Sequence, residues 1–250
     1  MLGKIENLAS GIRLNPGLDV SQLKVSFEKN LRLHIPGIIN EEAANGIHNS
    51  LKNEIGWNLA YNDDEGQKDL YARDQQNMPS AERQAFHQKI MARARTGTFQ
   101  YLYGSFAVGD AYKEGLIKDM FVARFFEFVN TPEMINLISD ITGIKGIKRA
   151  NMQATAYGPG HFLTDHNDFD PEKDRKVAFV FNMTKDWKAE WGGILQFLEE
   201  DGFSESGLIP TFNALNIFQV PQRHIVSQVS TYAPKVRFGL TGWFMGSEDG

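Results

Sequence analysis

Residues 150–168 read Ala-Asn-Met-Gln-Ala-Thr-Ala-Tyr-Gly-Pro-Gly-His-Phe-Leu-Thr-Asp-His-Asn-Asp, and this stretch decides the fold. Polar residues at positions 151, 153, 155 and 157 alternate with apolar residues at 152, 154 and 156. Because successive side chains of a strand point to opposite faces, the alternation predicts a strand with one polar face. The Gly-Pro-Gly that follows predicts a turn, after which the chain reaches His166 and Asp168.

The C-terminal segment 236–244 alternates in the same way, with Arg237, Gly239, Thr241 and Trp243 on one face. Further strands are predicted at 176–184, 193–198 and 215–220, separated by turn residues. A barrel with a polar interior at one end would explain both alternations. A sheet with one face in water is the alternative, and alternation does not separate the two.

The first half of the chain reads as helical. Apolar positions at helical spacing predict helices over about 41–55, 80–95, 117–129 and 131–143, the first of them capped by Asn40 and the last ended by Gly143. Helices followed by strands predict helical support for an antiparallel sheet or barrel. The polar segment 61–78 has no clear periodicity and is interpreted as a solvated loop or as a flap over a site.

Composition limits the class of protein. A chain of 250 residues with 42% hydrophobic residues is expected to form one domain, residues 1–250. The segment at 1–7 lacks the apolar run of a secretory signal and no apolar stretch is long enough to cross a membrane, so we expect a cytoplasmic protein without a membrane partner. A net charge of -5 argues against direct binding of nucleic acid, and the absence of cysteine leaves His, carboxylate or carbonyl groups as metal ligands.

Four residues of the second half carry the candidate chemistry. His166, Asp168 and His224 are the ligand types of a non-haem Fe(II) site, and a strand end would point His166 and Asp168 to the same side. Taken alone, such a triplet also fits turn or cap residues. Arg237 is predicted mid-strand, and a guanidinium inside a barrel is costly unless a protein carboxylate or a bound dianion neutralises it.

Six motifs occur in order over about residues 145–246. These are Tyr157-x-x-Gly160, His166-x-Asp168, Thr184-Lys-Asp-Trp187, Gly192-Gly-Ile-Leu-Gln-Phe197, His224 with Arg237, and Gly242-Trp-Phe244. Together they resemble the prolyl-hydroxylase-like branch of the 2-oxoglutarate and Fe(II)-dependent oxygenases. Leu31 to Ile39 is similar to the strand that often opens this branch.

The resemblance implies a mainly β fold with α, a double-stranded β-helix (a jelly roll, cupin-like) at 145–246, buttressed by the mostly helical residues 1–144. It implies that His166, Asp168 and His224 bind iron, and that Arg237 and Tyr157 hold the far carboxylate of 2-oxoglutarate. Secondary candidates implied for the co-substrate site are Thr241, Asn182 and Leu195, and those implied for the substrate are Trp243 and Arg175.

Two departures from the family pattern stand out. Asn182 lies where the family often has Tyr, and the spacing from His224 to Arg237 is long, which implies a bulge or loop near Ala233-Pro234. His161 is not a ligand in the family pattern and is interpreted as a loop residue.

The implied activity is hydroxylation of an unactivated C–H bond with Fe(II), 2-oxoglutarate and O2, with ascorbate as a candidate reductant. The leading hypothesis is a prolyl residue of a protein or peptide as substrate. The alternatives are a free amino acid or small metabolite as substrate, and a non-catalytic jelly-roll binding or sensing protein. The sequence leaves the oligomeric state open.

Overall fold

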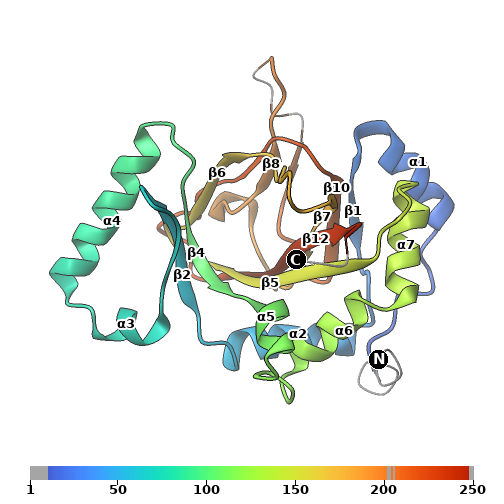
Figure 1. Ribbon diagram of the computed structural model, residues 1–250, viewed down its shortest axis with the longest axis horizontal. Helices are drawn as coiled ribbons and strands as arrows, with labels where there is room; N and C mark the ends of the chain where they lie inside the picture. Colours follow the sequence, from blue (N-terminus) through green and yellow to red (C-terminus); the bar gives the residue numbers. More distant parts are fainter. Residues whose placement is uncertain (1–10, 202–203, 205, 248–250) are drawn as a thin grey trace.

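The computed structural model describes residues 11–201, 204 and 206–247. Its core is a set of antiparallel strands in the order β1-β10-β7-β12-β5-β4-β6-β11-β8-β9, with the β2–β3 hairpin beside β4. The strands curl into a nearly closed jelly roll, the double-stranded β-helix expected from the resemblance (Figure 1), and among the described residues the two end strands of this order do not pair with each other. None of the helices in the described residues is long and apolar enough to cross a membrane.

In the described part of the second half, five strands lie close to their predicted positions, and the short strands at 162–166, 206–208 and 224–226 are additional to them. Together they are β5 (Arg149–Tyr157), β6 (Phe162–His166), β7 (Arg175–Asn182), β8 (Leu195–Phe197), β9 (Ser206–Leu208), β10 (Ala214–Gln219), β11 (His224–Val226) and β12 (Arg237–Met245). Residues 227–236 connect β11 to β12, so the long His224 to Arg237 spacing is taken up by a loop, as predicted.

The described part of the first half contains the four predicted helices and the strand expected within residues 31–39, together with three helices and three strands that were not predicted. Its helices are α1 (Val20–Asn30), α2 (Glu41–Asn53), α3 (Ala72–Asn77), α4 (Ser80–Arg95), α5 (Val108–Lys113), α6 (Phe121–Val129) and α7 (Pro132–Thr142). Its strands are β1 (Arg32–Pro36), β2 (Asn58–Asp63), β3 (Gly66–Leu70) and β4 (Tyr101–Phe106). The segment 61–78 is therefore not an irregular loop: it holds most of the β2–β3 hairpin and all of α3.

Helices α1, α2, α6 and α7 cover the outer face of the large sheet (Figure 1). Phe179, Phe181 and Leu240 point outward from β7 and β12 into this layer, and Phe125 of α6 meets Phe181 edge-on at 4.8 Å. Burial of each such side chain contributes about 1.5–3 kcal/mol. The inner face of β12 is thereby left for Arg237, Thr241 and Trp243, while the inner face of β7 carries Ala178 and Val180.

Asn40 is the N-cap residue of α2 as predicted, but it does not cap the helix through its side chain. Its Oδ1 accepts from the Arg13 backbone N–H at 2.8 Å and its Nδ2 donates to the Gly11 carbonyl at 3.0 Å. The amide thus fastens the N-terminal segment to the sheet, a long-range contact that competes with local capping.

Candidate active site

Three side chains meet where β6 and β11 pair. His166 is the last residue of β6, His224 is the first of β11, and the two are direct cross-strand partners. Asp168 Oδ1 lies 3.5 Å from His166 Nε2, and its Oδ2 lies 3.6 Å from His224 Nε2. The three potential ligand atoms all lie within 4.8 Å of one another, which is close enough for one ion.

Both imidazoles are held in the orientation that a metal requires. His166 Nδ1 lies 2.9 Å from the Thr164 carbonyl, and His224 Nδ1 lies 2.8 Å from the Gln222 carbonyl. Because a carbonyl only accepts, each Nδ1 carries the proton and each Nε2 presents its lone pair toward Asp168. Burial, followed by the neighbouring His166, lowers the pKa of His224 to about 4, so this ring is neutral near pH 7 and able to ligate.

The prediction that His166 and Asp168 converge through strand alternation is wrong. Asp168 lies beyond the end of β6, in the left-handed region with φ of 62°, so strand alternation does not aim it. A turn brings its carboxylate back toward the two rings. Arg175 holds this turn, because its Nη1 donates to the Asp168 carbonyl at 2.9 Å.

Arg237 lies deep inside the barrel beside Tyr157. It is the first residue of β12 rather than a mid-strand residue, pairs with Tyr157 of β5 and is only 3% exposed. Its Cζ lies 5.0 Å from the centre of the Tyr157 ring. Within the described part of the chain no carboxylate forms an ion pair with Arg237, and its buried Nε and Nη1 have no hydrogen-bond partner there.

An unpaired buried guanidinium indicates a ligand anion. Burial lowers the pKa of Arg237, which means that the folded protein disfavours its charge as long as no anion neutralises it. Of the two explanations that the sequence left open, the described residues therefore favour a bound anion over a protein carboxylate. A dicarboxylate that reaches from the triad to Arg237 fits both groups.

The secondary candidates for the co-substrate site divide into two groups. Thr241 and the buried Leu195 line the same cavity as the triad and Arg237. Asn182 is fully buried on the face of β7 shared with Ala178 and Val180, but it is not among the described residues that line the cavity. Neither amide atom of Asn182 has a hydrogen-bond partner in the described chain.

The two candidate substrate residues lie together at one wall of the cavity. The Arg175 guanidinium stacks on the Trp243 ring at 3.8 Å, and its Nη2 lies 3.4 Å from Asp170. The indole N–H of Trp243 is buried and unpartnered among the described residues, so it is free to bind a carbonyl. His161 accepts a bond from the Gly158 N–H at 3.1 Å, which fits the loop role expected for it.

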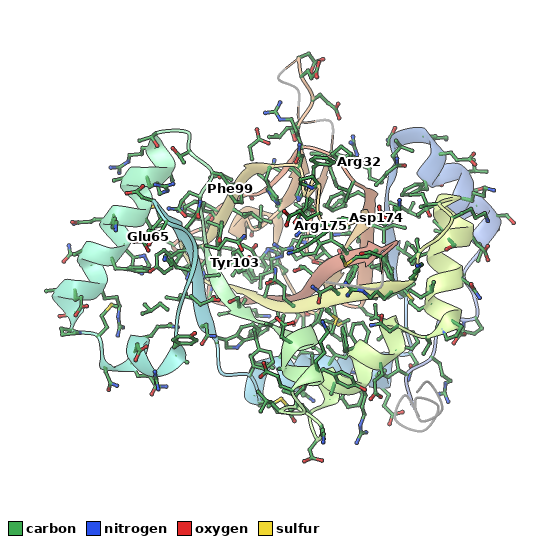
Figure 2. The ribbon with its side chains drawn as sticks, in the orientation of Figure 1. Arg32, Glu65, Phe99, Tyr103, Asp174 and Arg175 are labelled. Atoms are coloured by element: carbon green, nitrogen blue, oxygen red, sulfur yellow. The ribbon has the colours of Figure 1, made fainter. Side chains whose placement is uncertain are left out.

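The opposite wall was missed by the sequence reasoning. Phe99, Tyr101 and Tyr103 follow one another on one face of the chain at and before β4, and neighbouring rings lie 5.4 and 5.5 Å apart. Phe99 also lies 5.5 Å from the His166 ring, and Tyr103 stacks on Tyr157 at 5.0 Å. Figure 2 shows Phe99 and Tyr103 on the side of the barrel that faces Arg175. The alternation in Phe-Gln-Tyr-Leu-Tyr was the available signal for this strand.

Gln100 connects this aromatic wall to the triad. It is fully buried, and its backbone N–H donates to Thr164 Oγ1 at 2.9 Å while its carbonyl accepts from the Thr164 N–H at 2.9 Å. Thr164 supplies the carbonyl that orients His166. Gln100 therefore positions a ligand-bearing strand, although it touches none of the three candidate ligands.

One cavity of about 780 Å³ joins these parts. It extends from Arg237 and Tyr157 past the triad to the exposed side chains of Phe99 and Phe169. The volume lies within the range of small-molecule sites, about 300–1,000 Å³. A small dicarboxylate at Arg237 therefore leaves space beside the triad for part of a second reactant.

Comparisons with known proteins agree with this geometry. Residues 152–245 match the model of the 2OG-Fe(II) oxygenase superfamily. A prolyl-4-hydroxylase of Pseudomonas putida has a similar structure, with a TM-score of 0.58 at 15% identity over 91% of this chain and 99% of that one. A Trichoplax adhaerens prolyl hydroxylase, solved with a hypoxia inducible factor peptide fragment, has a TM-score of 0.61 and 13% identity over 91% of this chain and 89% of that one. A 2OG-Fe(II) oxygenase family oxidoreductase of Burkholderia pseudomallei has a TM-score of 0.58 and 11% identity over 94% of each chain.

The family match covers the strands that carry the His-Asp-His cluster and the buried arginine. The match over residues 152–245 and the geometry of the site support a 2-oxoglutarate- and Fe(II)-dependent dioxygenase, and the fold is that of the prolyl hydroxylases compared above. The cofactor of such an enzyme is Fe(II) and its co-substrates are 2-oxoglutarate and O2.

Proposed function

We propose that the protein hydroxylates a prolyl residue within a peptide or protein segment. His166, Asp168 and His224 hold Fe(II), and Arg237 with Tyr157 binds the far carboxylate of 2-oxoglutarate. Thr241 and Leu195 line the co-substrate site, and the amide of Asn182 lies behind it. When bound, Fe(II) and 2-oxoglutarate activate O2 for hydroxylation of an unactivated C–H bond, with release of succinate and CO2.

The residues of this chain bind and orient the reactants. The Thr164 and Gln222 carbonyls hold the two imidazoles, and the Asp168 turn brings the carboxylate to them. Arg237 fixes one end of the dicarboxylate by charge and direct hydrogen bonds. Trp243, with its unpartnered indole N–H, and the Arg175 side chain stacked upon it form the wall that receives the substrate.

The observation that carries the choice of a peptide is the shape of the cavity. It opens from the triad to exposed residues, so the target side chain can enter while the rest of a longer substrate stays outside. Two of the structures with the same fold are prolyl hydroxylases, and one of them was solved with a peptide.

A direct test compares proline-containing peptides with free L-proline. The protein, loaded with Fe(II) and 2-oxoglutarate, is incubated with each in air, and succinate release and the mass of the proline product are measured. We expect a gain of one oxygen in peptides and none in the free amino acid. Asp168→Ala serves as the inactive control, and Leu116→Ala, an exposed change outside the cavity, as the active one. Turnover of free proline with no peptide modified would contradict the proposal.

A further inference from the structure

Two exposed phenylalanines stand at the mouth of the active-site cavity. Among the described residues, Phe99 (36% exposed) and Phe169 (64% exposed) are the exposed large apolar side chains that line it. Phe99 contacts the His166 ring, and Phe169 directly follows Asp168 in the chain. Both rings are thus placed next to the triad while they remain open to solvent.

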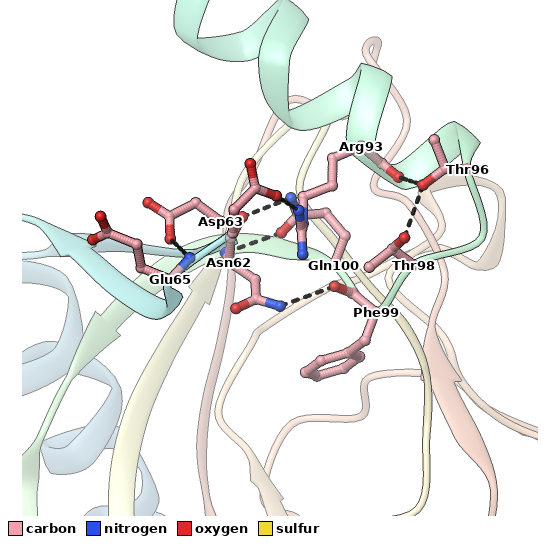
Figure 3. A network of polar contacts seen from close by, with 9 residues as sticks. Asn62, Asp63, Glu65, Arg93, Thr96, Thr98, Phe99 and Gln100 are labelled. Atoms are coloured by element: carbon pink, nitrogen blue, oxygen red, sulfur yellow. Dashed lines mark hydrogen bonds and ion pairs between the residues drawn. The ribbon is translucent and has the colours of Figure 1, made fainter.

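Phe99 is held in place by its neighbours. Asn62 Nδ2 donates to the Phe99 carbonyl at 3.1 Å, and the backbone of Asn62 exchanges two bonds with the Gln100 side chain at 3.0 and 2.9 Å. Figure 3 shows this network, with the Phe99 ring pointing away from it. The Phe99 carbonyl and the buried residue that follows it, Gln100, are thus both fixed, so the exposure of Phe99 is built into the fold.

The backbone of Phe169 is fixed as well. Its N–H donates to Asn167 Oδ1 at 3.1 Å, which closes a tight turn, and Arg175 holds the preceding carbonyl of Asp168. Phe169 is 64% exposed, so most of its apolar surface is available to a ligand. With Phe99, it gives the mouth two apolar contact points that are already ordered before anything binds, which lowers the entropic cost of binding.

The cations around the mouth are already engaged with carboxylates. Lys68 is paired with Glu65 at 2.7 Å, and Arg223 is paired with Asp165. The remaining cations at the mouth, Lys173 and Arg175, share Asp170. An acidic substrate segment would have to compete with these carboxylates, whereas an apolar side chain needs only the two rings.

We infer that Phe99 and Phe169 form an apolar clamp that selects peptides with a large aliphatic or aromatic side chain next to the hydroxylated residue. This inference rests on the proposed function, since it names the class of peptide that the same site takes. The clamp grips the neighbouring residue while the target side chain reaches the triad.

The test uses a set of short peptides with a central Pro or Ala and with Leu, Ser, Glu or Lys on both sides. Binding to the protein loaded with Fe(II) and 2-oxoglutarate is measured without oxygen, by competition against a fluorescent Leu-flanked peptide. Hydroxylation of the Pro peptides is then measured in air. Phe99→Ala, Phe169→Ala and the double variant are compared with Leu116→Ala, which removes an exposed apolar side chain outside the cavity.

We expect the unmodified protein and Leu116→Ala to bind Leu-flanked peptides at least tenfold more tightly than Ser-flanked ones, which is about 1.4 kcal/mol. Each clamp variant should reduce this ratio of affinities to about threefold or less. In the hydroxylation assay, each should raise KM for the Leu-flanked Pro peptide and keep kcat within about twofold of the value for the unmodified protein. The affinity for Fe(II) should be unchanged, which excludes an indirect effect through His166.

The outcomes separate the clamp from the proposed function. Three results would overturn the clamp and leave the proposed function intact, provided that Pro peptides are hydroxylated. These are that the protein shows no preference for Leu-flanked peptides, that it prefers peptides flanked by Glu or Lys, or that the double variant keeps the preference for Leu-flanked peptides. If the clamp variants lose the tighter binding of Leu-flanked peptides but no Pro peptide is hydroxylated, the clamp is supported and the prolyl function is contradicted.

Discussion

Arg237→Met is expected to stabilise the protein in the absence of 2-oxoglutarate and to abolish binding of that co-substrate. Arg237 is 3% exposed and its Nε and Nη1 have no hydrogen-bond partner among the described residues, and an uncompensated buried charge costs several kcal/mol. The cation–π contact of Arg237 with the Tyr157 ring offsets about 2 kcal/mol of this cost. A methionine fills much of the same space without the charge, so the net gain in unfolding free energy is about 1–3 kcal/mol, or roughly 3–10 °C in Tm.

The assay is thermal and urea unfolding of both proteins, with and without 2-oxoglutarate. At a concentration of 100 times Kd the co-substrate should stabilise the unmodified protein by about 2.7 kcal/mol and Arg237→Met not at all. Arg73→Met, a change at a largely exposed arginine, should alter neither value. A variant less stable than the parent by more than about 1 kcal/mol, or one that still responds to 2-oxoglutarate, would refute the account of Arg237 as an anion site kept at a cost in stability.

Four further substitutions test other parts of the molecule. His166→Ala and Asp168→Ala should each lower the affinity for Fe(II) at least about 100-fold in calorimetry and leave the far-ultraviolet circular dichroism unchanged; retention of metal would refute the ligand assignment. Gln100→Ala removes three hydrogen bonds of a fully buried amide and should lower the free energy of unfolding by about 2–3 kcal/mol. An unchanged midpoint of urea unfolding would contradict this structural role of Gln100. Gly192→Ala would place a Cβ 2.2 Å from the Gln228 carbonyl oxygen at a φ of 70°, so a loss of several kcal/mol is expected, and a neutral result would contradict the close approach.

The elements that were predicted correctly have a local signal. The strand alternation at 150–157 and 236–244 and the helical spacing in α2 and α7 record which face of each element is buried. Thr131 caps α7 through the Met134 N–H, and Gly143 ends it in the left-handed conformation, as residues of these types do. Such signals depend on neighbours within a few residues, so one sequence is enough to reveal them.

The features that were missed depend on distant partners. The β2–β3 hairpin is polar and pairs only on one side with β4, so it lacks the apolar periodicity of a buried strand. Asn40 looks like a helix cap, but its side chain bonds to the segment before β1. The turn at Asp168 depends on Arg175, seven residues further along the chain.

The sequence by itself determined the chemistry: two histidines, a carboxylate and an arginine on a strand-rich second half, in the order of a known family of oxygenases. Only the tertiary structure decided that the arginine is buried without an ion-pair partner among the described residues, and that Phe99 and Phe169 stand exposed at the mouth of the same cavity. The physical reason is that residue types fix which bonds a side chain can form, whereas burial and the supply of partners are set by strands far apart in the sequence.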